Sequence, residues 1–351
     1  MKVLFLTTKL NDVGGIQQYN RIFIETAREQ GHKVTIVEKI GGGLFSKSIF
    51  AAKSLLQGMR GWDLIWCGHI NFSPVGYFIW KVKKTPYAIS THGLETWELR
   101  ESHKEPVRNA KLITTVAHYS KKKLVEQIPE LENRVYMLYS FADGIKWHIK
   151  EKSQTLAKKL RLEGKKVILT VARLSKEEGY KGYDRIIQSL PRIQKDVPNT
   201  AYILVGKGDD APRVSRLVEE MGLQKDVILA GYVSDEELID YYNLADVFAM
   251  PSKKEGAPAV FLEALACGLP VIGGNCDGSS TPIMDGKVGF LIDPESIDEI
   301  TETIVKILKK EVEPKLLDGE WLRREMLAKF GKDKFEERVG EVMNLVQGED
   351  K

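Results

Sequence analysis

Short apolar runs alternate with segments of helical periodicity along the first half of the chain. The run Lys2–Thr7 predicts a buried strand, and a glycine turn at Gly14–Gly15 separates it from Ile16–Gln30, where apolar side chains recur every three or four residues. Further apolar runs of strand length lie at 34–37, 64–67, 87–90, 112–116 and 135–138. Helical stretches between several of these runs predict a mainly parallel sheet with helices on both faces.

A second series of strands and helices follows a connector at 139–165. Strands are expected at 167–171, 201–205, 227–229, 247–250 and 271–272, with helices at 183–193, 214–221, 236–243 and 259–266. Two α/β units in tandem place a ligand crevice at the carboxyl ends of the strands. The sequence therefore predicts an α/β protein with domains at 1–150 and 151–320. A charged helical tail at 321–351 can pack on either domain, with the N-terminal domain preferred.

Composition is that of an ordinary globular protein. Of the 351 residues, 43% are hydrophobic and 29% are charged, so two domains can each bury a core. No apolar stretch approaches the roughly 18–20 residues that span a bilayer, and the N-terminal run is interpreted as a strand rather than a signal peptide. Three cysteines without C-x-x-C spacing argue against a zinc site or a disulfide framework. The expected location is the cytoplasm.

The net charge of +3 is unevenly distributed, because residues 1–150 are basic and the remainder is acidic. This asymmetry indicates different partners for the two halves, although two solvated faces that happen to differ would look the same. Basic residues are interleaved with apolar ones at 47–60 and 78–84. Such a pattern suits peripheral docking on an anionic membrane, and it also fits an ordinary amphipathic helix packed on its own sheet. Nucleic acid is not expected as a partner because the overall charge is small.

The most informative segment runs from 251 to 272. Pro258 occupies a position that tolerates proline in a first helical turn, and Gly268 and Pro270 end the helix. Glu255 therefore lies in the loop before a helix, and Glu263 about a turn and a half inside it. The free N–H groups at the helix N-terminus favour an anion or sugar hydroxyls between these carboxylates. A loop acid and a surface helix acid are the alternative interpretation.

Three further groups of residues follow predicted strands. Arg173 and Lys181 could converge on one diphosphate, with Lys176 as a competitor for the second position. The turn at Gly14–Gly15 could approach a phosphate, although it is not the G-x-G-x-x-G fingerprint and could be a plain turn. His92 is a candidate general acid, base or hydrogen-bond donor, with a buried, hydrogen-bonded histidine as the alternative. His69 and His118 are less specific candidates on the acceptor side.

Together these segments resemble glycosyltransferase family 4, a group of retaining enzymes with the GT-B fold. The resemblance depends on the E-x7-E pair Glu255 and Glu263, followed by EALACGLPVI, and on a loop similar to R-x-x-x-K-G at 173–182. It extends from Lys2 to roughly Pro294 and is most specific over 167–294. It implies two Rossmann-like domains facing each other across a cleft, the first on the acceptor side and the second binding a nucleotide sugar.

The resemblance also implies a role for each candidate residue. Glu255 would contact the donor sugar, Glu263 the ribose, and Arg173 and Lys181 the diphosphate. His92 is the leading site residue of the first domain and joins Glu255, Arg173 and Lys181 as catalytic candidates. The remaining donor-side positions are Gly14, Gly15, Gly206, Gly208, Tyr232, Val233, Gly256, Ala257, Pro258, Ala259 and Val260.

The chain departs from the family pattern at three places. Ser140–Asp143 stands where N-G-V-D is usual, Asn275–Ser280 replaces a P-E pair, and Ala257–Pro258 replaces an aromatic and a small residue. The first departure bears on the hinge between the domains, and the second on the preference for a donor sugar.

The expected function is transfer of a hexose-type sugar from a UDP- or GDP-sugar to an acceptor hydroxyl, with retention of anomeric configuration and without a metal or other cofactor. The acceptor is expected to be a glycan or a lipid-linked sugar. A front-face mechanism and a double displacement through Glu255 both stay open. The alternatives are a nucleotide-sugar epimerase on the same fold and a non-catalytic nucleotide-sugar binding protein.

Overall fold

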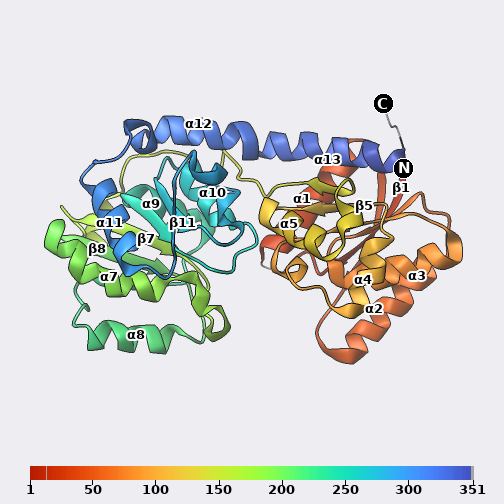
Figure 1. Cartoon of the computed structure of the whole chain (residues 1–351), viewed down its shortest axis with the longest axis horizontal. Coiled ribbons are helices and arrows are strands. Elements are labelled where there is room, and N and C mark those ends of the chain that lie inside the picture. The colour runs from red at the N-terminus through yellow and green to blue at the C-terminus, as the bar shows by residue number, and fades with distance from the viewer. Residues whose placement is uncertain (13, 349–351) are drawn as a thin grey trace. The chain divides into compact units, whose positions relative to one another are not determined.

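The computed structural model describes residues 1–12 and 14–348, and the chain divides into two compact units. The first unit comprises Met1–Ser140 and the segment from Asp333 onward, and the second comprises Phe141–Lys332. In each unit a sheet is packed between helices (Figure 1). The α/β fold class predicted from the sequence is confirmed.

The first unit contains a six-stranded parallel sheet in the order β2-β1-β3-β4-β5-β6. Its strands are β1 (Lys2–Thr8), β2 (Lys33–Lys39), β3 (Leu64–Cys67), β4 (Tyr87–Ser90), β5 (Leu112–Thr115) and β6 (Val135–Met137). The helices are α1 (Gly15–Glu29), α2 (Gly43–Gly58), α3 (Ser73–Lys83), α4 (Glu101–Arg108), α5 (His118–Gln127) and α13 (Lys332–Gln347). Strands β3, β4 and β5 are buried along their whole length, which explains their continuous apolar sequences.

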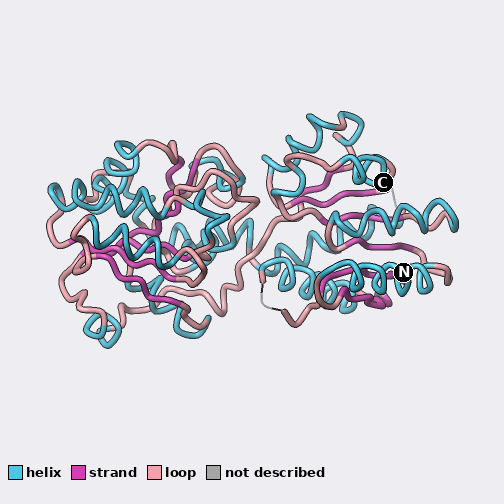
Figure 2. The backbone as a smooth tube through the Cα atoms, turned by 90° about the horizontal axis from the view of Figure 1, so that it is seen from below, coloured by secondary structure: helices cyan, strands magenta, loops and turns pink. Residues whose placement is uncertain are grey.

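The second unit also contains a six-stranded parallel sheet, in the order β12-β11-β10-β7-β8-β9. Figure 2 shows strands and surrounding helices in each unit. Its strands are β7 (Lys166–Val171), β8 (Thr200–Val205), β9 (Val227–Gly231), β10 (Val247–Met250), β11 (Val271–Gly274) and β12 (Phe290–Ile292). The helices are α6 (Gln154–Lys159), α7 (Tyr183–Asp196), α8 (Ala211–Glu220), α9 (Asp235–Leu244), α10 (Ala259–Ala266), α11 (Ile297–Leu308) and α12 (Gly319–Phe330). Helix α7 buries Ile186, Leu190 and Ile193 at helical spacing against the sheet.

Strand order fixes where each sheet can bind a ligand. In the second unit the chain runs from β7 outward to β9, then returns to place β10 on the other side of β7. The loops after β7 and β10 therefore lead away from a topological switch point, where open α/β sheets bind ligands at the carboxyl edge. The corresponding point in the first unit lies between β1 and β3.

The division of the chain differs from the expected boundaries at 150 and 320. Residues 141–150 belong to the second unit, because Ala142 N donates to Phe330 O at 3.0 Å and Arg323 donates to carbonyl oxygens of Gly144, Trp147 and Ala266. The expected tail is also not one piece, since α12 lies in the second unit and α13 in the first.

Candidate functional site

The switch point of the second unit gathers three of the four predicted catalytic residues. Lys181, at the end of the 3-10 segment η4 (Lys176–Lys181), places its Nζ 2.5 Å from Glu255 Oε1. Glu178 lies between the two basic residues, because it forms an ion pair with Arg173 and lies 3.6 Å from Lys181 Nζ. Lys181 is only 13% exposed, whereas Arg173 is 71% exposed. The arrangement is a chain of alternating charges from solvent to the buried carboxylate of Glu255.

The backbone of Glu255 is held on both sides by hydrogen bonds. Its backbone N–H donates to Asp277 Oδ2 at 2.8 Å, and its carbonyl accepts from the N–H of Gly278 at 2.8 Å. Burial raises the pKa of Glu255, and the neighbouring Lys181 opposes that rise. The loop before α10 therefore presents a carboxylate whose partner is already in place.

Asp277 is a residue of this site that the sequence did not single out. Besides the Glu255 N–H, it accepts Ser252 Oγ and the Ser279 N–H at 2.7 and 2.8 Å. A Cβ on Gly278 would lie 1.7 Å from Gly256 O, so glycine is needed for the loops to approach. The segment 275–280, which departs from the family pattern, thus holds the loop of Glu255 in place. Asp277 could have been singled out in the sequence as an acid just beyond the carboxyl end of β11.

Glu263 lies on α10 and is not a plain surface acid. Its Oε2 accepts the hydroxyl of Tyr242 at 2.8 Å, and burial raises its pKa to about 7. Gly256, Ala257 and Pro258 lead into the first turn of α10, which begins with Ala259 and Val260. These residues surround the amino end of a helix, where backbone N–H groups are free of helical partners.

The loop after β8 packs tightly on the loop after β7. A Cβ on Gly206 would lie 1.8 Å from Ala172 O, and one on Gly208 would lie 1.8 Å from Leu174 O. After β9, Tyr232 is exposed with Lys207 Nζ 4.7 Å from its ring centroid, and Val233 is buried. The structure therefore gives the two glycines a packing role, and their nucleotide contacts stay a prediction.

Lys176 does not join the chain of charges at Lys181. Its backbone N–H donates to Asp209 Oδ1 at 3.0 Å, and the residue is exposed at the start of η4. Of the two lysines considered for the second diphosphate position, Lys181 is the one beside Glu255.

His92 lies in the first unit, just beyond the carboxyl end of β4. Its Nε2 is 2.9 Å from Gly68 O, and a carbonyl oxygen only accepts, so Nε2 carries the proton and Nδ1 has a free lone pair. The ring packs against Tyr19 and His69 at centroid distances of 5.1 and 5.8 Å. Burial lowers the pKa of His92 and lowers that of His69 to about 4, so both rings are neutral near pH 7.

The other first-unit candidates lie near the same sheet edge. Gly15 begins α1 and Gly14 precedes it in an extended conformation, while Val13 of the same turn lies outside the described residues. His118 begins α5, and its Nε2 lies 3.1 Å from the Tyr139 hydroxyl. Neither glycine has the left-handed φ angle that would explain its identity, so their role stays a prediction.

A family model described as glycosyl transferases group 1 matches residues 151–331, which is more than half of the chain. The chain belongs to this family. The match covers the segment with Arg173, Lys181, Glu255 and Glu263, and it confirms the family that the sequence predicted.

Curated relatives match this chain over only part of its length. A GDP-mannose-dependent alpha-(1-6)-phosphatidylinositol monomannoside mannosyltransferase of Mycolicibacterium smegmatis is 36% identical over 135 residues, which are 36% of this chain and 35% of that protein. Spore coat protein SA of Bacillus subtilis is 30% identical over 233 residues, covering 62% of this chain and 61% of that one. The chain thus matches about a third of the length of the first relative.

Solved structures support the GT-B fold of this group 1 transferase. Anabaena Alr3699/HepE in complex with UDP and glucose aligns with a TM-score of 0.80 over 98% of this chain and 99% of that chain, at 18% identity. Sucrose-phosphate synthase from Thermosynechococcus elongatus gives 0.79 over 98% of each, at 17% identity. At these identities the likeness establishes the fold.

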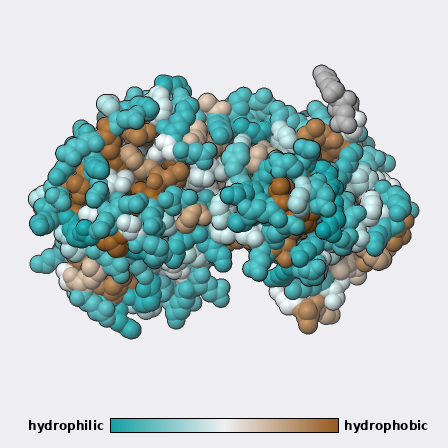
Figure 3. Space-filling view, in the orientation of Figure 1, coloured by the Kyte–Doolittle hydropathy of each residue, from teal (hydrophilic) through white to brown (hydrophobic). Residues whose placement is uncertain are grey.

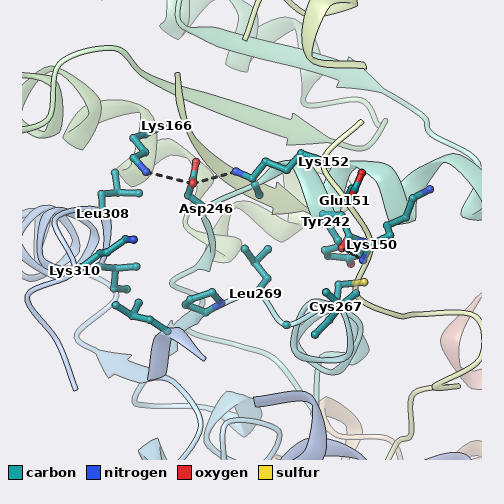
Figure 4. Close-up of a pocket in the computed structure, with 17 residues that line it drawn as sticks. Lys150, Glu151, Lys152, Lys166, Tyr242, Asp246, Cys267, Leu269, Leu308 and Lys310 are labelled. Atoms are coloured by element: carbon teal, nitrogen blue, oxygen red, sulfur yellow. Dashed lines mark hydrogen bonds and ion pairs between the residues drawn. The ribbon is translucent and has the colours of Figure 1, made fainter. Parts of the chain in front are cut away.

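A separate pocket of about 420 Å³ lies on the transferase's second unit, at the opposite edge of the sheet (Figure 4). Lys166 is the first residue of β7, and Asp246 and Pro270 directly precede β10 and β11, so the pocket opens at the amino ends of these strands. Lys152 and Lys166 both form ion pairs with Asp246 there, at 3.1 and 3.6 Å. None of the predicted site residues lines this pocket.

Within residues 1–12 and 14–348, no group of three or more His, Cys, Asp and Glu side chains is placed to hold a metal ion. Across the same residues, no helix is long and apolar enough to cross a membrane.

Proposed function

We propose that this protein is a retaining glycosyltransferase that transfers a hexose-type sugar from a UDP- or GDP-sugar to an acceptor hydroxyl. The observation that carries the proposal is the ion pair between Lys181 and Glu255 at the switch point of the second unit, beside the amino end of α10. A cation for phosphate and a carboxylate for sugar hydroxyls are there held 2.5 Å apart. The names of the relatives, among them a GDP-mannose-dependent mannosyltransferase, are consistent with such a donor.

In this proposal the donor lies along the carboxyl edge of the second sheet. Lys181 and Arg173 bind the diphosphate and stabilise the charge that develops on it as the sugar leaves, without a metal. Glu255 binds sugar hydroxyls, since one of its oxygens is already engaged by Lys181. Glu263, with Tyr242 holding one carboxyl oxygen, binds the ribose through the other. His92 accepts a hydrogen bond at Nδ1 on the acceptor side.

The first test is a screen of purified protein against UDP-, GDP- and ADP-sugars, which follows the melting temperature and nucleotide release with and without a membrane lipid extract. Stabilisation by one donor, with release that depends on the extract, supports the transferase. Interconversion of donor sugars without an acceptor supports the epimerase instead. Binding without turnover in any extract supports a binding protein, and no stabilisation by any donor contradicts the proposal.

A lipid-linked acceptor is proposed from the surface of α2 and α3. Helix α2 buries Phe50, Ser54 and Gly58 on one face, as packing on its own sheet requires. On its opposite face Phe45 and Leu56 are 80% and 69% exposed. The remaining exposed large apolar residues nearby are Ile40, Leu44, Ile49, Phe78 and Val82. In Figure 3 hydrophobic surface lies over α2 and α3, where a globular protein ordinarily presents polar residues.

Charge favours an anionic lipid surface as the occupant of this face. From Lys39 to Leu94 the sequence contains a single acidic residue, Asp63. The basic residues of that stretch are Lys39, Lys47, Lys53, Arg60, Lys81, Lys83 and Lys84. Apolar side chains that enter the lipid and lysines that meet its headgroups suit peripheral docking of a cytoplasmic enzyme.

Co-sedimentation with vesicles containing anionic phospholipid tests this docking. The double variant Phe45→Ser, Leu56→Ser is expected to bind at least about tenfold more weakly than the wild type, because two large side chains no longer enter the bilayer. Ile145→Ser is the control, since Ile145 is 89% exposed but lies in the second unit. Equal binding of vesicles by the double variant and the control would show that α2 is not the docking face.

A further inference from the structure

The loop between β7 and α7 is anchored at both ends, with Glu178 between the anchors. At its start the Lys176 N–H donates to Asp209. At its end the Lys253 N–H donates to Tyr180 O at 3.0 Å, and a Cβ on Gly182 would lie 2.2 Å from Pro251 O. Glu178 is the one residue of η4 with non-helical backbone angles, at φ −112° and ψ 25°. Both ends of the loop are thus held by backbone contacts, and its irregular backbone is at Glu178, between them.

The carboxylate of Glu178 occupies a position between the two cations of the donor site. One oxygen is bound by Arg173. The other is buried, makes no hydrogen bond among the described residues, and lies 3.6 Å from Lys181 Nζ. A buried carboxylate oxygen without a hydrogen bond is unfavourable unless nearby positive charge compensates it. The two cations that supply this charge are those assigned to the diphosphate.

We infer that Glu178 is an internal counter-ion that competes with the donor diphosphate for Arg173 and Lys181. The inference rests on the proposed function. Phosphate oxygens replace the carboxylate on the exposed guanidinium of Arg173, and Glu178 moves toward solvent. When the nucleoside diphosphate leaves, Glu178 returns to both cations. No bond to carbon or phosphorus changes in this exchange, and Glu178 contacts neither sugar nor nucleotide.

A counter-ion at Glu178 predicts the direction in which Glu178→Gln changes the affinity for nucleotide. Replacing the carboxylate with an amide removes a negative charge that opposes the entering phosphates, so nucleotide binding becomes tighter. The gain is larger for the released nucleoside diphosphate than for the sugar nucleotide, because the released form carries one more negative charge. If Glu178 served only to hold Arg173 and Lys181 in position, the same substitution would weaken binding of both. A partly unfolded variant would also bind more weakly.

The experiment compares Glu178→Gln with Glu177→Gln by calorimetric titration with UDP, GDP and inorganic pyrophosphate. Glu177 is the exposed neighbour on the same loop, so its variant makes the same change in charge one residue away. Glu178→Gln is expected to bind the nucleoside diphosphate about 3–10-fold more tightly than the wild type, with product inhibition strengthened by the same factor. The KM for the sugar nucleotide falls by a smaller factor, and Glu177→Gln stays within about twofold of wild type.

The outcomes separate this inference from the proposed function. Nucleotide binding by the wild type, together with equal or weaker binding by Glu178→Gln, overturns the counter-ion and leaves the transferase proposal standing. Tighter binding of pyrophosphate alone by Glu178→Gln supports the counter-ion while counting against a nucleotide donor. If wild type and variant both bind none of the three ligands, both proposals fail.

Discussion

The two sheets are both parallel and six-stranded, but their carboxyl edges carry opposite chemistry. In the second unit, Arg173, Glu178, Lys181 and Glu255 form a continuous chain of charges. In the first unit, His92 bonds to a backbone carbonyl and is held neutral by burial. Two parallel sheets of different strand order thus present, at the same kind of edge, a charged cluster in one unit and a neutral histidine in the other. This difference agrees with a charged donor on the second unit and an acceptor hydroxyl on the first.

Among the substitutions that test this difference between the two edges, removal of Lys181 is expected to have the largest effect on activity. Lys181→Ala deletes a phosphate-binding cation and leaves the carboxylate of Glu255 unpaired, so kcat should fall by about 10²–10³-fold. Nucleotide release from the preferred donor measures it. Lys176→Ala is the matched control, since that lysine is exposed and only its backbone is engaged with Asp209. Turnover of Lys181→Ala within a few-fold of the control would contradict the assignment.

Asp277 should have a smaller effect that reaches both stability and activity. In Asp277→Asn one acceptor oxygen becomes an NH2 group facing the donors Ser252, Glu255 N–H and Ser279 N–H. We expect a loss of about 1–3 kcal/mol in the free energy of unfolding by urea, and about a tenfold loss of kcat as the Glu255 loop shifts. Asp285→Asn is the control, because Asp285 is exposed and its left-handed conformation suits asparagine. Unchanged stability would show that the three bonds are dispensable.

The third prediction is a contrast in pH dependence between the units. The pKa of Glu263 is raised to about 7 in the folded state. Its contribution to the stability of the folded state is therefore fully present below about pH 4.5 and is lost as the pH rises through about 7. The pKa of His69 is lowered to about 4, so its contribution is present above about pH 6.5 and is lost as the pH falls through about 4. Acidification from pH 7 should therefore stabilise the folded structure around Glu263 and destabilise the folded structure around His69.

Hydrogen exchange of the whole chain at several pH values reports this contrast, with segments of α10 and of β3 followed separately. Each effect should amount to about 1–2 kcal/mol. Glu263→Gln should flatten the dependence in α10, and His69→Gln should flatten it next to β3. If both segments lose protection together on acidification, the two edges do not differ as described.

Much of the fold could be predicted from the sequence because buried parallel strands leave long apolar runs. β3 and β4 lie at the residues expected, since every side chain on them is buried. The three-residue strand β12 was not expected from the sequence. The tail could not be divided in advance, since its break at Lys332 depends on contacts of Arg323 with carbonyl groups far away in sequence.

The sequence predicted most residues of the candidate site but not the contacts between them. Glu255 and Lys181 were paired with different parts of a donor, but spacing does not reveal that they contact each other. Glu178 was not predicted as a site residue, because its position between two cations depends on how η4 bends. Asp277 was part of a segment that departs from the family, and its three hydrogen bonds appear only when β11 is placed beside β10.

The proposed function requires that the charged edge of the second unit binds the nucleotide of the donor. Hydrogen exchange measured by mass spectrometry, with and without saturating UDP or GDP, tests it directly. The account predicts slower exchange over 173–182 and 254–263 with the preferred nucleotide, and unchanged exchange in the lysine-lined pocket at 149–152 and 307–310. Protection confined to that pocket, or no protection with either nucleotide, would contradict it.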